Sequence, residues 1–177
     1  SNNKIYLVEN INDVENLPII KKSKVAYVTQ TTLSIDDTKD IVNFIKSKYS
    51  SIVEPKKEDI CYATTNRQEA VKQIANKCDV FIVIGSKNSS NSLRLVEVAK
   101  NYGAKKTILI DDIESLEISL FSKSKSIGIT ASASSPEILI KKILNKLDDH
   151  FNINLIESNF EKENIHFKIP QKLKEDK

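Results

Sequence analysis

Residues 80–92 read VFIVI followed by GSKNSSNS, an unbroken apolar run and then a run of small and polar residues. A short apolar run without alternation fits a parallel strand that is buried on both faces of its sheet. After the polar loop, Leu95, Val96 and Ala99 recur at helical spacing, and Gly103 suits the end of a helix. This stretch therefore predicts a buried strand, a polar loop and a helix, in that order.

The same order recurs before and after this stretch. Further strands are predicted at 4–8, 24–29, 52–53, 106–110 and 126–130, and further helices at 34–48, from 65, from 111 and from 136. Strands that alternate with helices favour an α/β fold with parallel sheets and right-handed crossovers. Ligands of such folds bind beyond the carboxyl ends of the strands, and the polar loops of this chain occupy that position.

Particular side chains are expected to begin these helices. Ser34 suits an N-cap, because its hydroxyl can accept from a backbone N–H of the first turn. Thr65 and Gln68 have the spacing of a capping box. Ser135 is expected to cap the last helix, with Pro136 at its first position.

Composition excludes several classes of protein. The 177 residues are 40% apolar and 29% charged, with a net charge of +3, which is typical of a globular protein. The lysines are scattered without interleaved aromatic residues, which argues against nucleic-acid binding. No apolar run approaches the ~20 residues that cross a bilayer, and the first residues do not read as a signal peptide.

The chain has two cysteines, too few for a disulfide scaffold, so a reducing compartment is expected. Cys61 follows the short apolar entry at Ile60 and stands at a helix start, where three interpretations stay open: a small buried thiol, a nucleophile or a cluster ligand. The lack of a nearby histidine argues against the nucleophile, and a cluster would need further thiolates. Cys78 is interpreted as structural, and His150 and His166 as surface residues.

Polar loops of one design follow three of the predicted strands: QTTLS at 30–34, GSKNSSNS at 85–92 and TASASSP at 130–136. Each offers small hydroxyl or amide side chains and unpaired backbone N–H groups at a helix start, which suits an anion such as phosphate. Lys87 could add a positive charge. Ordinary capping and turn chemistry is the alternative explanation. No Walker or GxGxxG pattern is present, so nucleotide binding is not indicated.

Several long stretches resemble one enzyme family, the 4-hydroxy-3-methylbut-2-enyl diphosphate reductases, also called IspH or LytB. The stretches are TQTTLSIDDT (29–38), DICYATTNRQEAV (59–71), GSKNSSNS (85–92), LIDD (109–112), TASASSPE (130–137) and the tail ENIHFKIPQKL (163–173). The resemblance implies reductive removal of an allylic hydroxyl, which gives isopentenyl and dimethylallyl diphosphate in the non-mevalonate isoprenoid pathway.

The resemblance also implies roles for particular residues. Ser89, Ser90 and Asn91 match the family's diphosphate-binding loop. Ser134 matches the serine of the last loop, although this chain reads TASAS where the family usually has TAGAS. Thr31 matches a threonine beside the substrate hydroxyl and is the expected catalytic residue.

Cys61 matches one of three cysteines that hold a [4Fe–4S] cluster in the family. The other two cysteines, the histidines around the diphosphate and a proton-delivering glutamate belong to an N-terminal part with no counterpart here. The resemblance implies ferredoxin or flavodoxin as electron donor. The chain is therefore expected to be an inactive fragment of the reductase, the missing N-terminal part of the same protein being its partner. The alternative is a non-catalytic module that binds a diphosphate or a partner protein.

The family fold has three similar α/β units around a central cluster. Residues 1–57 are expected to be the remnant of the second unit, 58–145 the third unit, and 146–177 the C-terminal tail. A cytoplasmic location in a bacterium is the default expectation, with a plastid-type organelle as the alternative.

Overall fold

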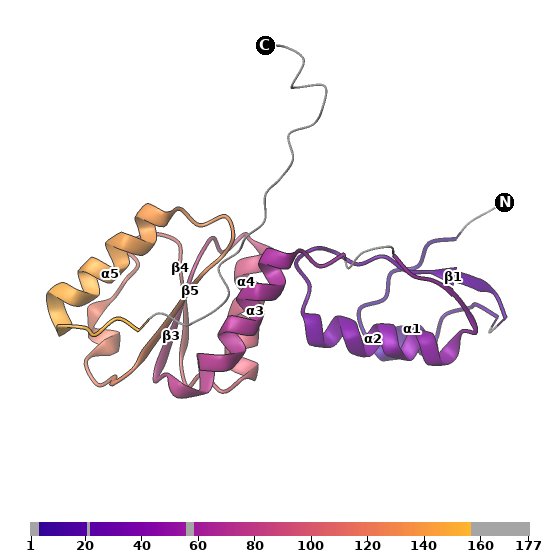
Figure 1. The fold of residues 1–177 in the computed structure, drawn as a ribbon, viewed down its shortest axis with the longest axis horizontal. Helices are drawn as coiled ribbons and strands as arrows, with labels where there is room; N and C mark the ends of the chain where they lie inside the picture. The colour runs from indigo at the N-terminus through magenta and orange to yellow at the C-terminus, as the bar shows by residue number, and fades with distance from the viewer. Residues whose placement is uncertain (1–3, 21, 56–58, 157–177) are drawn as a thin grey trace, which may run out of the picture.

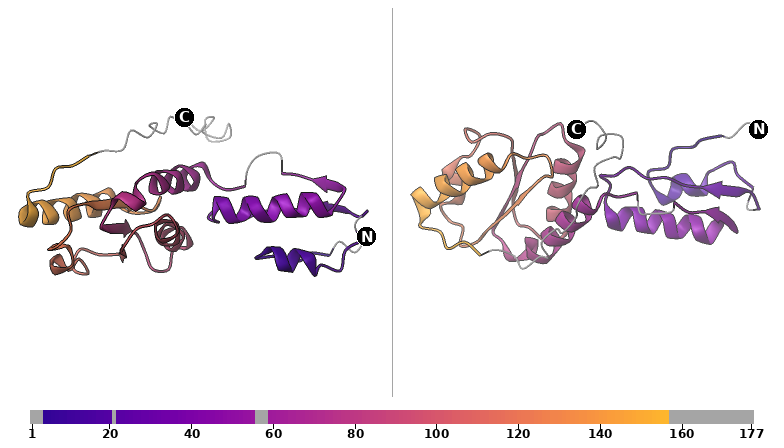
Figure 2. Two further views of the ribbon diagram at one scale, coloured as in Figure 1. Left: turned by 90° about the horizontal axis from the view of Figure 1, so that it is seen from below. Right: turned by 45° about the horizontal axis from the view of Figure 1, so that its top comes forward.

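The computed structural model describes residues 4–20, 22–55 and 59–156, and these form two groups of elements. Residues 4–55 carry a sheet of two strands, and residues 59–156 carry a sheet of three. We call these groups the first and second lobes. Figures 1 and 2 show them side by side, with α3 of the second lobe nearest to α2 of the first.

The second lobe is built on β3 (Val80–Ile84), the strand predicted from the unbroken apolar run. It lies between β4 (Thr107–Ile110) and β5 (Ile127–Ala131), and both neighbours run parallel to it. In register, Ile82 stands opposite Ile108 on one side and Ile129 on the other. All five residues of β3 are buried, which confirms the expectation of a strand covered on both faces.

Helices cover both faces of this sheet (Figure 1). On one face, α3 (Tyr62–Ile74), the short 3₁₀ helix Ala75–Lys77 and α4 (Ser90–Asn101) pack against Phe81 and Val83. On the other face, α5 (Glu137–Phe151) and the 3₁₀ helix Ile118–Phe121 pack against the remaining residues of β3. Successive residues of β3 thus enter two separate cores, as the alternation of side chains along a strand requires.

The first lobe is smaller. Its strands β1 (Lys24–Ala26) and β2 (Ser51–Val53) are parallel, and its helices are α1 (Ile11–Glu15) and α2 (Ile35–Lys48). Its core is formed by Val14, Ile45 and Tyr49. The whole arrangement confirms the predicted α/β fold with parallel sheets.

Two strand predictions in this lobe need correction. Residues 4–8 form neither a helix nor a strand in the structure, and Ile5 and Leu7 are exposed. The strand predicted at 24–29 ends at Ala26. The backbone N–H of Thr29 donates instead to the Asp59 carboxylate, at 2.8 Å, so the end of this stretch is bound by the second lobe.

Two of the expected helix starts also differ from the structure. The predicted capping box is wrong, because α3 begins three residues earlier and the N–H of Thr65 donates to Cys61 O inside the first turn. The cap of α5 is Pro136 rather than Ser135, whose hydroxyl donates to Ile84 O at 2.7 Å. Ser34 is confirmed as the N-cap of α2.

Gly103 follows α4 with φ +92, a conformation that glycine adopts without strain. The helix predicted from Asp111 is reduced to the 3₁₀ turn at 118–121. His150 is exposed, as expected, but it lies in the last turn of α5 rather than in a polar tail. His166 and the edge strand expected at Phe167 and Ile169 lie outside the described residues.

Candidate functional site

Cys61 lies at the N-cap of α3, with an exposed side chain and extended backbone angles. Its N–H donates to Thr31 O at 3.1 Å, and its carbonyl accepts from the first turn of the helix. The structure therefore places Thr31, which is also exposed, directly against Cys61 although 30 positions separate them in the sequence. The exposure rules out the buried-thiol interpretation of Cys61.

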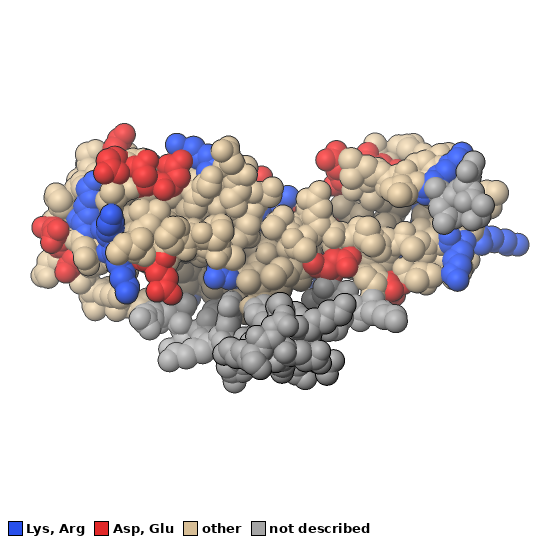
Figure 3. All heavy atoms as spheres, turned by 90° about the horizontal axis from the view of Figure 1, so that it is seen from above, with Lys and Arg blue, Asp and Glu red and all other residues tan. Residues whose placement is uncertain are grey.

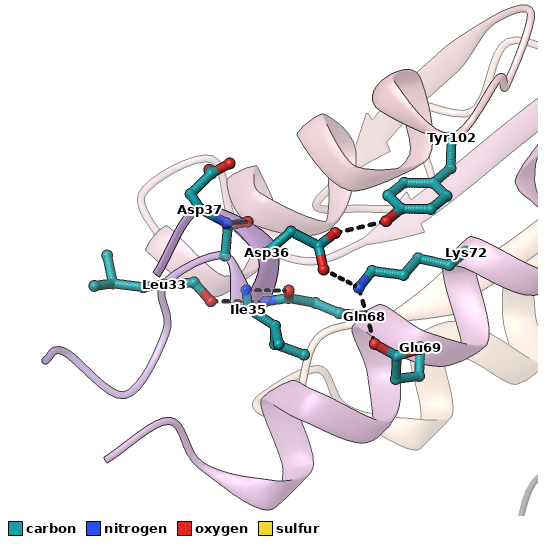
Figure 4. A network of polar contacts seen from close by, with 9 residues as sticks. Leu33, Ile35, Asp36, Asp37, Gln68, Glu69, Lys72 and Tyr102 are labelled. Carbon is teal, nitrogen blue, oxygen red and sulfur yellow. Dashed lines mark hydrogen bonds and ion pairs between the residues drawn. The ribbon is translucent and has the colours of Figure 1, made fainter. Parts of the chain in front are cut away.

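The segment 29–35, which contains Thr31, is attached to the second lobe at alternate residues. Asp59 accepts from Thr29 N, and Cys61 donates to Thr31 O. Gln68 makes the next two bonds: its Nε2 donates to Leu33 O at 2.8 Å, and its Oε1 accepts from Ile35 N at 3.1 Å (Figure 4). Gln68 is fully buried, so both bonds form away from water.

A charged cluster lies beside Gln68 (Figure 4). Lys72 of α3 bonds the carboxylates of Asp36 and Glu69, each at 2.8 Å, and Tyr102 donates to Asp36 at 2.6 Å. Hydrogen bonds from Lys72 and then Tyr102 lower the pKa of Asp36. Partial burial opposes the charge of Lys72, but the two carboxylates outweigh it and raise the lysine pKa. The start of α2 is thus held against both α3 and α4.

The loop after β3 leads into α4, whose N-cap is Ser89. Its hydroxyl accepts from Ser92 N at 3.3 Å. The next residues are more unusual: Asn91 is 8% exposed and Ser92 0%, yet Asn91 Oδ1 and Ser92 Oγ have no hydrogen-bond partner among the described residues. Such groups normally have a partner, so they point to a polar ligand or water at this helix start. Lys87 Nζ lies 3.6 Å from Asp111 Oδ2, so the positive charge of Lys87 is paired with an acidic side chain.

The loop after β5 presents a chain of serine hydroxyls. Ser135 Oγ donates to Ile84 O, so Ser132 is the donor in the 2.9 Å bond between Ser132 and Ser135. The weaker 3.4 Å contact between Ser132 and Ser134 then requires Ser134 to donate. Ser134 is exposed and can turn its proton from this long bond toward a ligand at little cost.

Gly85 allows these two loops to approach each other. A Cβ atom at this position would clash with Ser92 Oγ and lie 3.0 Å from Ser132 Oγ. The hydroxyls of the two loops therefore pack around the carboxyl end of β3, where only glycine leaves them room. The loops at 85–92 and 130–136 form one hydroxyl-rich surface, which we call the serine surface.

Helix α3 connects the serine surface to Thr31 and Cys61. Arg67 Nε donates to Ala131 O at the end of β5, and its Nη1 donates to Ala63 O. One helix thus presents Cys61 at its start and contacts both the 29–35 segment and the last loop. Among the described residues, no hydrogen bond or ion pair joins Thr31 or Cys61 directly to Ser89, Ser90, Asn91 or Ser134. These two sets are linked through α3.

The donor set for a metal is incomplete in the part of the chain that the structure describes. It holds no group of three or more His, Cys, Asp or Glu residues placed to bind a metal ion. Cys61 offers one exposed thiol, and Cys78 is unsuited because it is buried and donates to Ile74 O at 3.2 Å. Burial raises the pKa of Cys78, which disfavours its thiolate further. A cluster with three thiolate ligands would need two of them from outside the described residues.

Several residues of the site were missed or misassigned in the sequence. The sequence pattern predicts Gln68 as a cap of its own helix, whereas in the structure it bonds Leu33 and Ile35 at the start of α2. Ser92 lay in the quoted loop, but no sequence pattern marks it as buried and unpartnered. Gly85 and Arg67 act through contacts between distant segments, which single-sequence patterns do not report.

Comparison with known proteins decides the family. The sequence matches the LytB protein family over residues 1–148. The chain belongs to the LytB protein family. This confirms the resemblance read from the motifs. A curated LytB relative, the 4-hydroxy-3-methylbut-2-enyl diphosphate reductase of Phenylobacterium zucineum, is 46% identical over 169 residues, covering 96% of this chain and 54% of that protein.

Solved structures agree with this assignment. The E-1-hydroxy-2-methyl-but-2-enyl-4-diphosphate reductase of Plasmodium falciparum superposes with a TM-score of 0.80 and 38% identity, over 94% of this chain and 51% of that one. A second structure, that of an (E)-4-hydroxy-3-methyl-but-2-enyl diphosphate reductase described as the terminal enzyme of the non-mevalonate pathway, gives a TM-score of 0.50 and 31% identity over 80% of this chain and 49% of that one. This LytB chain spans about half the length of the relatives that it matches.

The surface adds two facts about the LytB chain. On the face seen in Figure 3, acidic and basic side chains are interspersed over both lobes. Within residues 4–20, 22–55 and 59–156, no helix has both the length and the apolar character needed to cross a membrane.

Proposed function

We propose that this chain forms the part of a 4-hydroxy-3-methylbut-2-enyl diphosphate reductase that holds the diphosphate and supplies one cluster thiolate. The observation that carries the proposal is the 3.1 Å hydrogen bond between Cys61 N and Thr31 O. It brings the proposed cluster ligand against the proposed catalytic residue. Membership of the LytB family and the reductase names of its relatives support the same reaction.

The serine surface is the proposed diphosphate site. Ser89, Ser90, Asn91 and Ser134 would donate hydrogen bonds to the phosphate oxygens, assisted by the N-terminal N–H groups of α4. The unpartnered Ser92 hydroxyl supports this assignment, because a phosphate oxygen would accept the hydrogen bond that this hydroxyl can donate. A site of neutral donors binds through directed hydrogen bonds rather than through net charge.

The reaction breaks the allylic C–O bond and releases the hydroxyl as water, which consumes two electrons and two protons. A [4Fe–4S] cluster, when bound, would supply the electrons, and Cys61 would be one of its three protein ligands. Thr31 would hydrogen-bond the departing hydroxyl and orient it. Ferredoxin or flavodoxin would deliver electrons, and a bacterial cytoplasm or a plastid-type organelle would be the compartment. The division into units 1–57, 58–145 and 146–177 also remains a prediction.

Two of the three cluster cysteines would come from the half of the reductase fold that this chain does not cover. A chimera tests this directly: the chain replaces the matching part of the Phenylobacterium zucineum reductase, with which it shares 46% identity. The anaerobically reconstituted chimera should convert the hydroxylated diphosphate into isopentenyl and dimethylallyl diphosphate, while the 177-residue chain alone should not. A folded chimera without turnover, or turnover by the isolated chain, would refute the proposal.

A second candidate function, diphosphate binding without catalysis, is favoured by the same unpartnered Ser92 hydroxyl. It predicts that the isolated chain binds inorganic diphosphate and that Asn91→Ala weakens the binding. Titration calorimetry measures both, with Asn101→Ala at the far end of α4 as the matched control. Heat indistinguishable from dilution would remove this candidate.

A further inference from the structure

We infer that Gln68 is a positioning residue, which sets the placement of Thr31 relative to Cys61 without touching either. The starting observation is its location. Gln68 is fully buried in α3, seven residues after Cys61, and its amide bridges Leu33 O and Ile35 N of the other lobe. Thr31 lies two residues before Leu33, and its carbonyl accepts from Cys61 N. The importance of Gln68 for catalysis rests on the proposed function, whereas its effect on the position of Thr31 does not.

The bridge requires an amide at this position. Leu33 O can only accept and Ile35 N can only donate, so their common partner must donate from one atom and accept at another. Gln68 does both with one side chain, at 2.8 Å and 3.1 Å. An apolar side chain of similar size would leave both backbone groups without this partner. A buried unpaired group costs free energy, so the 29–35 segment would move away from α3 to regain water.

The neighbouring contacts do not replace the bridge. Lys72 bonds Asp36 beyond the far end of the segment, and Asp59 bonds Thr29 at its beginning. Between these ends, the Cys61–Thr31 bond and the Gln68 bridge are the only hydrogen bonds between the segment and α3 among the described residues. The Cys61–Thr31 bond should therefore lengthen or break when the bridge is lost.

Amide hydrogen exchange in the full 177-residue chain tests this, because it needs neither cluster nor turnover. In Gln68→Met, the protection factors of the Ile35 and Cys61 amides should fall at least tenfold. The amide of Gly85, which donates to Ile110 O in the second lobe, should change less than twofold. Gln73→Met, at an exposed glutamine of the same helix, is the matched control and should change none of the three.

Cys61 decides the outcome, because Gln68 does not contact its amide. Unchanged Cys61 protection in Gln68→Met would overturn the inference, and so would an equal loss at Gly85, which would indicate global destabilisation only. A second arm uses the active chimera, where Gln68→Met should lower kcat at least tenfold and leave the substrate KM within twofold. A raised KM with unchanged kcat would also overturn it. Inactivity of the parent chimera would count against the proposed function alone, since the exchange result stands without it.

Discussion

At the scale of single residues, Ser89 and Ser92 show how neighbouring serines at one helix start can have opposite effects on stability. Ser89 caps α4 through its hydroxyl, whereas Ser92 is fully buried with an unpartnered hydroxyl. Removing a cap costs about 1 kcal/mol, but removing an unpaired buried hydroxyl relieves a penalty. Substitutions of the two serines therefore test the stability of the fold and the binding of diphosphate separately.

We accordingly expect Ser89→Ala to lower the free energy of unfolding by about 1 kcal/mol. Ser92→Ala should leave it unchanged or raise it, yet weaken binding of inorganic diphosphate. Urea unfolding measures the first effect and calorimetry the second. A loss of stability in Ser92→Ala comparable to that of Ser89→Ala would mean that the Ser92 hydroxyl has a partner within the fold.

The polar loops and Gln68 differ in how far the sequence alone predicts their contacts. The loops at 85–92 and 130–136 could be predicted as an anion site, because hydroxyl and amide side chains recur where a predicted strand leads into a helix, and that site stays a prediction. Gln68 could not, since the spacing to Thr65 satisfies the capping-box pattern equally well. Its true partners, Leu33 and Ile35, lie 35 and 33 residues away, and only the fold reveals them.

At the scale of elements, Asp79 ties together the amino ends of the three parallel strands. It immediately precedes β3, and its carboxylate accepts from Lys105 Nζ, which precedes β4, and from the backbone N–H of Lys125, which precedes β5. The Asp79 N–H donates to the hydroxyl of Ser126, the residue just before β5. The hydrogen bond from Lys105, followed by that from Lys125 N, lowers the pKa of Asp79 from 3.8 to about 2. The ionised carboxylate therefore stabilises the folded sheet.

This shift predicts a pH dependence. Because the folded pKa lies below the unfolded one, the stabilisation is complete above about pH 5 and is lost as the pH falls from about 4 to 2. Asp79→Asn should be less stable at pH 7 and should lose less further stability over that acidic range. Urea unfolding midpoints between pH 2 and 7 measure this dependence. Asp149→Asn, at an exposed residue of α5, is the charge-matched control. Parallel acid curves for Asp79→Asn and the parent would contradict the assignment.

Element prediction succeeded where local sequence was sufficient. The unbroken apolar run of β3 and the Ser34 cap gave correct elements because neither depends on distant residues. The stretch 24–29 reads as one strand, but its last residues are bound by Asp59 and form no ladder. Tertiary contacts overrode β propensity there, as they often do at the ends of strands.

At the scale of the whole molecule, the first lobe exposes several large apolar side chains. Ile5, Leu7, Ile20 and Val28 are each at least 77% exposed, and all lie between residues 4 and 28. Single exposed apolar residues are common, but a group in one small lobe is typical of a surface that another part of a protein covers. The proposed function assigns that cover to the half of the reductase fold that this chain does not span.

Leu7→Lys tests whether another part of the reductase covers these apolar side chains. In the 177-residue chain Leu7 is 81% exposed, so the substitution should change stability by less than about 0.5 kcal/mol. In the chimera, where the surface is expected to be buried, the same substitution should cost about 2 kcal/mol. Thermal or urea unfolding of both proteins measures the difference. Equal effects in the two contexts would show that the surface stays exposed.

Cys61, held against Thr31, is the proposed protein ligand of the iron–sulfur cluster. Iron and sulfide analysis of the reconstituted chimera tests this role most directly, with the two cysteines of this chain as a matched pair. Cys61→Ser should lose most of the bound iron and the reductase activity, whereas Cys78→Ser, at a buried cysteine that bonds Ile74 O, should retain both. Full iron content and turnover in Cys61→Ser would show that Cys61 is not a cluster ligand.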